Sequence, residues 1–166
     1  MMFRKMRPDL KYDDIYAIDL DALRDSGVTG LFFDIDNTLE PYSTLEPCEK
    51  LSGWISALLK GGFRVGVLSN ARRERIEKFI SGFPLSIRDE VLYVCDAGKP
   101  LKKGFKKLCA AAGLTPGQSA MVGDQLFTDI LGGNRSGLTT VLVKPIDPTI
   151  EPLFVRFKRL FERPFL

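Results

Sequence analysis

The nine residues LFFDIDNTL, at positions 31–39, hold the pattern that decides the fold. Three consecutive large apolar residues have the length and composition of a buried β-strand. They lead directly into two aspartates, Asp34 and Asp36, and then into Thr38. A strand that is apolar on both faces is typical of a parallel sheet covered by helices on both sides. The stretch therefore predicts a buried strand that ends in carboxylates at one edge of a sheet.

Strand-sized apolar runs and helix-like segments alternate along the rest of the chain. Further strands are predicted at 64–68, 91–94, 120–122 and 139–143, and helices at 48–60, 72–80 and 100–112. The last of these helices stops before Gly113, a typical residue at a helix C-terminus. Such alternation predicts an α/β fold, a Rossmann-like three-layer sandwich with a mainly parallel sheet.

The composition is that of an ordinary globular protein with one domain. The chain has 166 residues, of which 45% are hydrophobic and 27% charged, so we expect a single domain over residues 1–166. The formal net charge of +3 is too small to predict a nucleic-acid partner. The sequence has no apolar run of about 18 residues, and its basic start lacks a secretory apolar stretch, so we expect a cytoplasmic protein without a transmembrane segment.

Two absences narrow the chemistry. The sequence contains no histidine, which excludes His general bases, Ser-His-Asp triads and most zinc sites. Cys48, Cys95 and Cys109 match no zinc or redox spacing, and we expect them to be reduced thiols. Catalysis would therefore use carboxylates, lysine, hydroxyls and a hard metal ion.

Polar residues follow several predicted strands directly. Asp34, Ser69 and Asp124 each come after a strand, and Lys99 follows 91–94 closely, so one sheet edge would collect all four. Phosphate-ester hydrolysis suits this set, because Mg²⁺ prefers carboxylate and water ligands and neutralises phosphate charge. A carboxylate nucleophile divides hydrolysis into two displacements, and Asp36 could protonate the leaving oxygen. Each residue alone could instead be a turn or helix-capping residue.

Four short motifs carry a resemblance to a known family. DIDNTL at 34–39 resembles the DxDxT[LV] signature of haloacid dehalogenase-like (HAD) phosphatases. VLSN at 67–70 is similar to the second motif of that superfamily, GKP at 98–100 to the third, and GD at 123–124, with Asp129, to the fourth. The motifs keep the family's order and span a catalytic core of about residues 29–145. Four ordered motifs are far more specific than one.

The resemblance implies a role for each matching residue. Asp34 would be the nucleophile, carrying an aspartyl phosphate, and a Mg²⁺ ligand. Asp36 would be the general acid and base, with its backbone carbonyl on the metal. Asp124 would complete the metal site, and Asp129 would support it through Lys99 or a metal-bound water. The resemblance assigns phosphate binding to Thr38, Ser69, Asn70 and Lys99, with Thr38 also ordering the loop.

The spacing of the motifs leaves no room for the large cap domain that many superfamily members carry. The first gap holds a short loop, 40–47, and one helix, and the second gap, 71–98, fits a helix, a turn and a strand. We therefore expect a HAD-like core with an open site. By family resemblance, an open site suits a large substrate such as a protein, a nucleic-acid end or a lipid head group.

Nearly the whole chain resembles the small class III branch of the superfamily, which includes the phosphatidylglycerophosphate (PGP) phosphatases. The residues that carry this resemblance are GDQLFTD at 123–129, LGGNR at 131–135 and KPI at 144–146. It implies that the substrate is PGP, met at the anionic inner face of a membrane. Some branch members have a lysine where this chain has Ile35. A phosphatase for a soluble metabolite or a protein, and a non-catalytic phospho-accepting or binding module, remain as alternatives.

Two basic features bear on the partner. Five lysines recur at helical spacing and would form either a solvated face or a surface for an anionic bilayer: Lys99, Lys102, Lys103, Lys106 and Lys107. Residues 146–166 form a basic amphipathic tail, whose helix would end near Pro164. Its apolar stripe is Leu153, Phe154, Phe157, Leu160 and Phe161, interspersed with Arg156, Lys158, Arg159 and Arg163. We favour packing of this stripe on the chain's own sheet, with an interfacial helix as the alternative.

Overall fold

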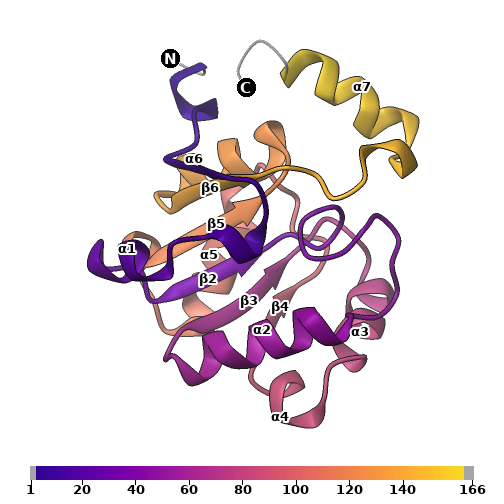
Figure 1. Cartoon of the computed structure of the whole chain (residues 1–166). Coiled ribbons are helices and arrows are strands. Elements are labelled where there is room, and N and C mark those ends of the chain that lie inside the picture. The colour runs from indigo at the N-terminus through magenta and orange to yellow at the C-terminus, as the bar shows by residue number, and fades with distance from the viewer. Residues whose placement is uncertain (1–2, 163–166) are drawn as a thin grey trace.

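The computed structural model describes residues 3–162, and its centre is a six-stranded sheet whose paired strands are all parallel (Figure 1). The strands are β1 (Leu10–Tyr12), β2 (Gly30–Phe33), β3 (Arg64–Leu68), β4 (Leu92–Val94), β5 (Ser119–Gly123) and β6 (Thr139–Val143). Their order across the sheet is β1-β6-β5-β2-β3-β4. The predicted α/β class and mainly parallel sheet are confirmed, and β1 is a strand that the sequence patterns did not indicate.

The described part of the chain also contains seven α-helices and several shorter helical turns, most of which connect the strands. The α-helices are α1 (Leu20–Asp25), α2 (Glu49–Lys60), α3 (Arg73–Ser81), α4 (Leu85–Arg88), α5 (Lys102–Ala112), α6 (Leu131–Ser136) and α7 (Leu153–Glu162). The 3-10 turns are η1 (Phe3–Met6), η2 (Ile15–Ala17), η3 (Pro116–Gln118) and η5 (Pro148–Ile150), and η4 (Leu126–Ile130) is a π-helical turn. The predicted helices 48–60, 72–80 and 100–112 correspond to α2, α3 and α5. Gly113 ends α5 in the left-handed conformation, with φ 68°.

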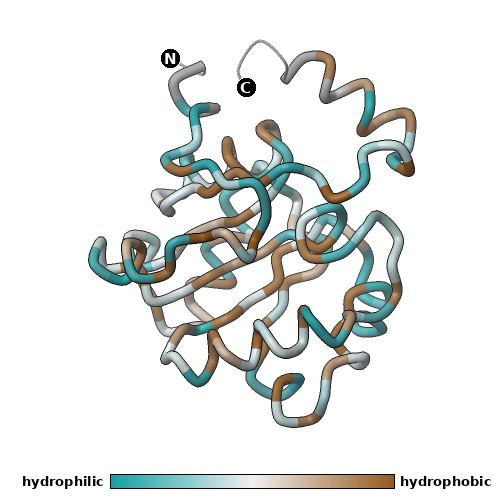
Figure 2. Tube along the Cα trace, in the orientation of Figure 1, coloured by the Kyte–Doolittle hydropathy of each residue, from teal (hydrophilic) through white to brown (hydrophobic). Residues whose placement is uncertain are grey.

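Alternating side chains of the strands build two cores, one on each face of the sheet. In β2, Leu31 and Phe33 join the core beneath α2 and α3, whereas Phe32 points to the opposite core beneath α5. All three are fully buried, as period-two alternation between two covered faces requires. The result is a three-layer sandwich, in which the strands and the inner sides of the helices carry the most hydrophobic residues (Figure 2).

The connections after β2 and β3 are short, as expected for a core without a large cap. A loop and α2 lie between β2 and β3, and α3 and α4 lie between β3 and β4. Since β2 lies between β5 and β3 in the sheet, the loops that follow these three strands meet at one edge. None of the helices within residues 3–162 has the length and hydropathy to cross a bilayer.

The C-terminal helix differs from the favoured expectation. α7 forms as predicted, but it lies outside the two helix layers (Figure 1). Its side chains Leu153, Phe154, Phe157 and Leu160 are exposed. The expectation that this stripe packs on the sheet is therefore wrong, because α2, α3 and α5 already cover the two faces of the sheet. The side chains of Lys158, Arg159 and Phe161, and residues Arg163 and Pro164, lie outside the described part.

Candidate active site

The side chains that follow β5, β2 and β3 converge at the carboxyl edge of the sheet. Asp34 follows β2, Asp124 follows β5 and Ser69 follows β3, and each is buried. A cavity of about 230 Å³ opens at this edge. Its lining includes Asp34, Asp36, Tyr42, Ser69, Asn70, Lys99, Gln125, Thr128, Phe154 and Val155. The sheet thus brings together residues from all four predicted motifs.

Three buried carboxylates surround one point. Oxygen atoms of Asp34, Asp124 and Asp129 lie within 4.8 Å of one another, and the three residues are 6%, 3% and 0% exposed. The ammonium of Lys99 lies 2.9 Å from Asp34 Oδ1 and 2.7 Å from Asp129 Oδ1. One ammonium cannot neutralise three carboxylates, and unpaired buried charge is costly. The cluster is therefore suited to a divalent cation.

Burial dominates the protonation of the nucleophile candidate. Desolvation, together with the smaller repulsion from the Asp129 carboxylate, outweighs the attraction of Lys99 and raises the pKa of Asp34 to about 6. Burial alone would lower the pKa of Lys99, but the carboxylates of Asp129 and Asp34 outweigh it and raise that pKa. Lys99 is thus held as a cation between two carboxylates.

A hydrogen bond to Asp124 and close packing of Asp129 fix the positions of these two carboxylates. The hydroxyl of Thr38 donates a hydrogen bond of 2.9 Å to Asp124 Oδ1, joining the first motif to the fourth. Asp129 packs so closely on Gly123 that a Cβ at that position would overlap its carboxylate. Asp129 projects from the π-helical turn η4 and also accepts a bond from the backbone N–H of Gln125. Assignment of Thr38 to phosphate remains a prediction, since its O–H is directed to Asp124.

Asp36 lines the cavity, but its side chain is not part of the acidic cluster. It forms an ion pair with Arg75 of α3 and accepts a hydrogen bond of 3.2 Å from the backbone N–H of Ser43. Arg75 also donates to the carbonyl of Thr44, so it ties the loop after the first motif to α3. The sequence analysis did not identify Arg75, which lies among several other charged residues of one helix.

The second and third motifs are joined by the side chain of Asn70 and the backbone of Lys99. Asn70 Nδ2 donates to the carbonyl of Lys99, and the N–H of Lys99 donates to Asn70 Oδ1, at 3.1 and 2.7 Å. Ser69 Oγ accepts a bond from the N–H of Ala71. In this structure Asn70 positions the lysine, while its predicted contact with phosphate stays a prediction. Because Lys99 precedes α5 and is buried, it does not belong to the exposed lysine face, which comprises Lys102, Lys103, Lys106 and Lys107.

The residue directly after Asp36 anchors the C-terminal segment. Asn37 has φ 63°, a conformation that asparagine tolerates better than most residues. Its Nδ2 donates to Glu151 Oε1 at 2.7 Å and to the carbonyl of Asp147 at 3.0 Å, and its carbonyl accepts from Ile146 at 3.1 Å. The chain after β6 is thereby fastened to the loop that carries Asp34 and Asp36. Nothing in the local sequence around Asn37 or Glu151 signalled this link.

Comparison with known proteins agrees with the geometry. The family described as "HAD-hyrolase-like" matches residues 96–145. The chain is 31% identical to "Probable phosphatase YqeG" of Bacillus subtilis, over 100% of this chain and 92% of that protein. It is also 31% identical to "Phosphatidylglycerophosphate phosphatase 1, chloroplastic/mitochondrial" of Arabidopsis thaliana, covering 93% of this chain but only 45% of that protein.

Solved structures share the fold at low sequence identity. The p-nitrophenyl phosphatase from Archaeoglobus fulgidus matches with a TM-score of 0.59 and 15% identity, over 84% of this chain and 93% of that one. An uncharacterized protein from Listeria monocytogenes matches with a TM-score of 0.59 and 21% identity, over 76% and 86%. The solved structures show the fold, and the full-length relative and the convergent motifs show the family: the chain belongs to the HAD superfamily of phosphatases, together with the probable phosphatase YqeG.

Proposed function

We propose that this protein is a Mg²⁺-dependent phosphomonoester hydrolase that works through an aspartyl phosphate on Asp34, with PGP as its substrate. The observation that carries the proposal is the buried cluster of Asp34, Asp124 and Asp129 around Lys99. Asp34 and Lys99 of this cluster line the cavity at the carboxyl edge of the sheet. Such a site combines a nucleophile, a cation site and a fixed positive charge, which are the groups that phosphoryl transfer needs.

The donor set fits a hard divalent cation. Asp34 and Asp124, with the backbone carbonyl of Asp36, would hold Mg²⁺, which takes oxygen ligands and keeps several waters. Bound there, the ion would neutralise charge on the phosphoryl group and on the carboxylates. Lys99 keeps Asp129 paired at 2.7 Å, so Asp129 supports the site in our assignment.

Asp34 and Asp36 would carry out the two displacement steps. Asp34 Oδ attacks phosphorus, the bond to the leaving oxygen breaks, and Asp36 gives its proton to that oxygen, leaving a phosphoryl group on Asp34. Asp36 then takes a proton from water, whose oxygen attacks the same phosphorus, releasing inorganic phosphate and restoring the Asp34 carboxylate. Arg75 keeps Asp36 oriented at the cavity through their ion pair.

Two donors remain for the phosphoryl oxygens. An ammonium has three N–H donors, and Asp34 and Asp129 accept two of those of Lys99. The third can donate to substrate. Ser69 Oγ accepts from Ala71, which leaves its own O–H for a phosphoryl oxygen. Both residues therefore keep the phosphate-binding role that the motifs assign to them.

The choice of a lipid substrate rests on the relatives and on the open site. Two of the relatives are named as PGP phosphatase 1, and the chain covers 45% and 59% of their lengths. We place the protein in the cytoplasm, peripheral at the anionic inner face of the membrane, where its substrate would lie.

Phosphate release from a panel of esters tests the proposal. The panel comprises p-nitrophenyl phosphate, glycerol phosphate, a sugar phosphate and short-chain PGP, each assayed with Mg²⁺ and with EDTA. We expect release that requires Mg²⁺, with the highest kcat/KM for PGP. Turnover of PGP that persists in EDTA would contradict the mechanism, and preference for a soluble ester would replace the lipid assignment with the metabolite alternative.

A further inference from the structure

The C-terminal helix α7 presents its apolar side to solvent. At 100° per residue, Leu153, Phe154, Phe157 and Leu160 occupy an arc of about 120° on α7, and Val155 lies roughly opposite its centre. The four stripe residues are 79%, 67%, 60% and 55% exposed, whereas Val155 is 8% exposed. The helix therefore rests on the domain through the side opposite its stripe, which reverses the usual orientation of a surface helix.

Exposed apolar side chains concentrate around this helix. Of the ten large hydrophobic residues that are exposed in the described part of the chain, six lie between 146 and 160. They are Ile146, Ile150, Leu153, Phe154, Phe157 and Leu160. Isolated exposed apolar residues are ordinary, but a contiguous patch marks a surface that meets another apolar phase.

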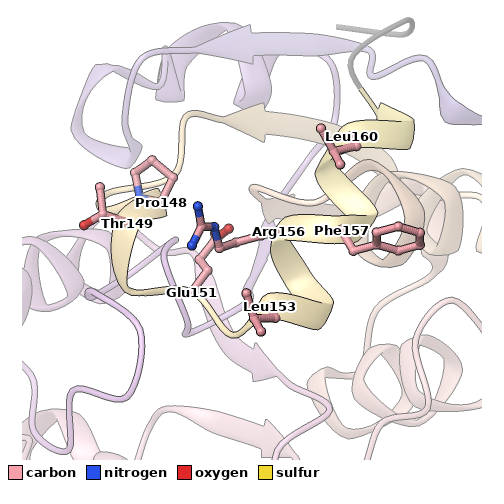
Figure 3. A pocket seen from close by; sticks show the side chains of 7 residues that line it. All are labelled: Pro148, Thr149, Glu151, Leu153, Arg156, Phe157 and Leu160. Atoms are coloured by element: carbon pink, nitrogen blue, oxygen red, sulfur yellow. The ribbon is translucent and has the colours of Figure 1, made fainter.

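The stripe borders a groove whose lining includes the guanidinium of Arg156. The groove has a volume of about 750 Å³ and is lined by Pro148, Thr149, Glu151, Leu153, Arg156, Phe157 and Leu160. Figure 3 shows Leu153, Phe157 and Leu160 following one another along α7, with Arg156 directed to the side of Pro148 and Glu151. Apolar side chains beside an exposed guanidinium match the boundary between acyl chains and anionic head groups.

The active site opens on the other side of the same helix. Phe154 and Val155 line the catalytic cavity together with Asp34, so α7 separates that cavity from the groove. The base of the helix is fixed by Asn37, through Glu151 and Asp147. Any surface that the stripe of α7 contacts would therefore lie next to Asp34.

The charge around α7 favours an anionic surface. Residues 152–166 contain four basic residues, Arg156, Lys158, Arg159 and Arg163, against one acidic residue, Glu162. Exposed Lys5, Arg7 and Arg135 lie near η1 and α6, which pack on each other, and η1 and α7 both contact η4. Basic residues near an anionic bilayer strengthen binding to it.

We propose that α7 is a docking surface that seats this protein on a bilayer of anionic phospholipid and brings lipid phosphomonoesters to the cavity beside it. The proposal rests on the lipid substrate of the proposed function, and it assigns the contact to the exposed stripe of α7. The charge of the segment favours a bilayer over a second copy of the chain, because two copies would bring like charges together.

Vesicle sedimentation of the full chain tests the docking surface without any catalysis. Vesicles of phosphatidylcholine, alone or with about one third phosphatidylglycerol, are mixed with three proteins. These are the wild type, the Phe157→Glu/Leu160→Glu variant, and a Leu45→Glu/Leu85→Glu variant that alters exposed apolar residues elsewhere. We expect the wild type and the control to bind the anionic vesicles, and the α7 variant to bind at least about ten-fold more weakly.

A water-soluble phosphomonoester assayed in parallel separates docking from catalysis. All three proteins should hydrolyse it at equal rates, because neither Phe157 nor Leu160 lines the catalytic cavity. Equal vesicle binding by the α7 variant and the wild type, or no binding by the wild type, would overturn the docking proposal while leaving the phosphatase chemistry standing. A dimer of the wild type that the α7 variant loses, seen by sedimentation velocity, would replace the bilayer with a second copy of the chain.

Discussion

The catalytic edge and the C-terminal segment lie side by side but are built in opposite ways. Asp34, Lys99, Asp124 and Asp129 are at most 6% exposed, and each contacts another member of the site or a neighbouring motif. The stripe of α7 is more than half exposed. At the catalytic edge the charged side chains contact one another inside the fold, whereas the side chains of the stripe are exposed on the surface of the helix. Burial therefore fixes the positions of the charged groups, and our docking proposal assigns the contact with the lipid surface to the exposed stripe.

The largest effect is expected from removing the nucleophile. Asp34→Asn preserves the size of the side chain and its contact with Lys99, yet cannot form an acyl phosphate. We expect kcat for p-nitrophenyl phosphate to fall on the order of 10⁴-fold or more. The matched control is Asp25→Asn at an exposed position, which should retain full activity. Activity of the Asp34→Asn variant within ten-fold of the wild type would remove the buried edge from the mechanism.

A methyl group beneath the cluster tests how tightly this edge is packed. Gly123→Ala would displace Asp129, and with it Lys99, without contacting substrate. We expect kcat to fall about 100-fold, because misplaced catalytic groups lose much of their effect. Gly117→Ala is the control, since a Cβ there meets no atom within 4 Å. Equal kinetics for both variants would show that the close packing of Asp129 is irrelevant to catalysis.

The pH dependence of the free energy of unfolding tests whether Asp34 is a buried carboxylate at the catalytic edge. Because burial raises the pKa of Asp34 from 3.8 to about 6, the folded state binds the proton more tightly than the unfolded state. In EDTA, the free energy of unfolding of the wild type should therefore fall as pH rises from about 4 through 6. Asp34→Asn should lack that fall and be more stable above pH 6 by roughly 1 to 3 kcal/mol. Urea unfolding curves at several pH values measure this, and parallel curves for the two proteins would contradict it.

The ion pair at the cavity rim should give a smaller effect. Arg75→Gln removes the partner of Asp36 but leaves the acidic cluster intact. We expect about a ten-fold lower kcat with little change in KM, because orientation of the general acid is lost. Arg73→Gln, which breaks an exposed pair with Glu77 in the same helix, is the control. A change in KM alone would assign Arg75 to substrate binding instead.

The smallest effect is expected at the junction of the two regions. Glu151→Ala removes the acceptor of one hydrogen bond from Asn37, while Asn37 still donates to the carbonyl of Asp147 and accepts from the N–H of Ile146. We expect a two- to five-fold loss of kcat on a soluble ester, since the other bonds of Asn37 keep the loop in place and a hydrogen bond contributes about 1 kcal/mol. Glu46→Ala, at an exposed pair with Lys78, should be neutral. A loss as large as that of Gly123→Ala would mean that the C-terminal segment belongs to the catalytic edge.

The catalytic edge was largely predictable because its residues follow strands directly. An apolar run ending in Asp34 or Asp124 identifies both the strand and the side of the sheet on which the carboxylate lies. Arg75 and Glu151 were not predictable, because they reach Asp36 and Asn37 across 39 and 114 residues through tertiary contacts. Short elements such as β1 and α1 were also not predicted from the sequence, since three to six residues carry little periodicity.

The C-terminal helix shows the limit of periodicity. The spacing of its apolar residues correctly predicted α7 and its stripe, because one helical face repeats every three to four residues. Spacing does not say what covers the face. The position of α7 depends on Asn37 of the distant catalytic loop, which holds the preceding segment beyond the sheet edge.

The stereochemical course at phosphorus tests the central claim most directly. A phosphorothioate monoester made chiral with an oxygen isotope is hydrolysed by the wild type with Mg²⁺ in isotopically labelled water, and the configuration of the released thiophosphate is determined. Two successive in-line displacements, the first by Asp34 and the second by water, predict net retention of configuration. Net inversion would mean that water attacks the ester directly, and it would contradict the assignment of Asp34 as the nucleophile.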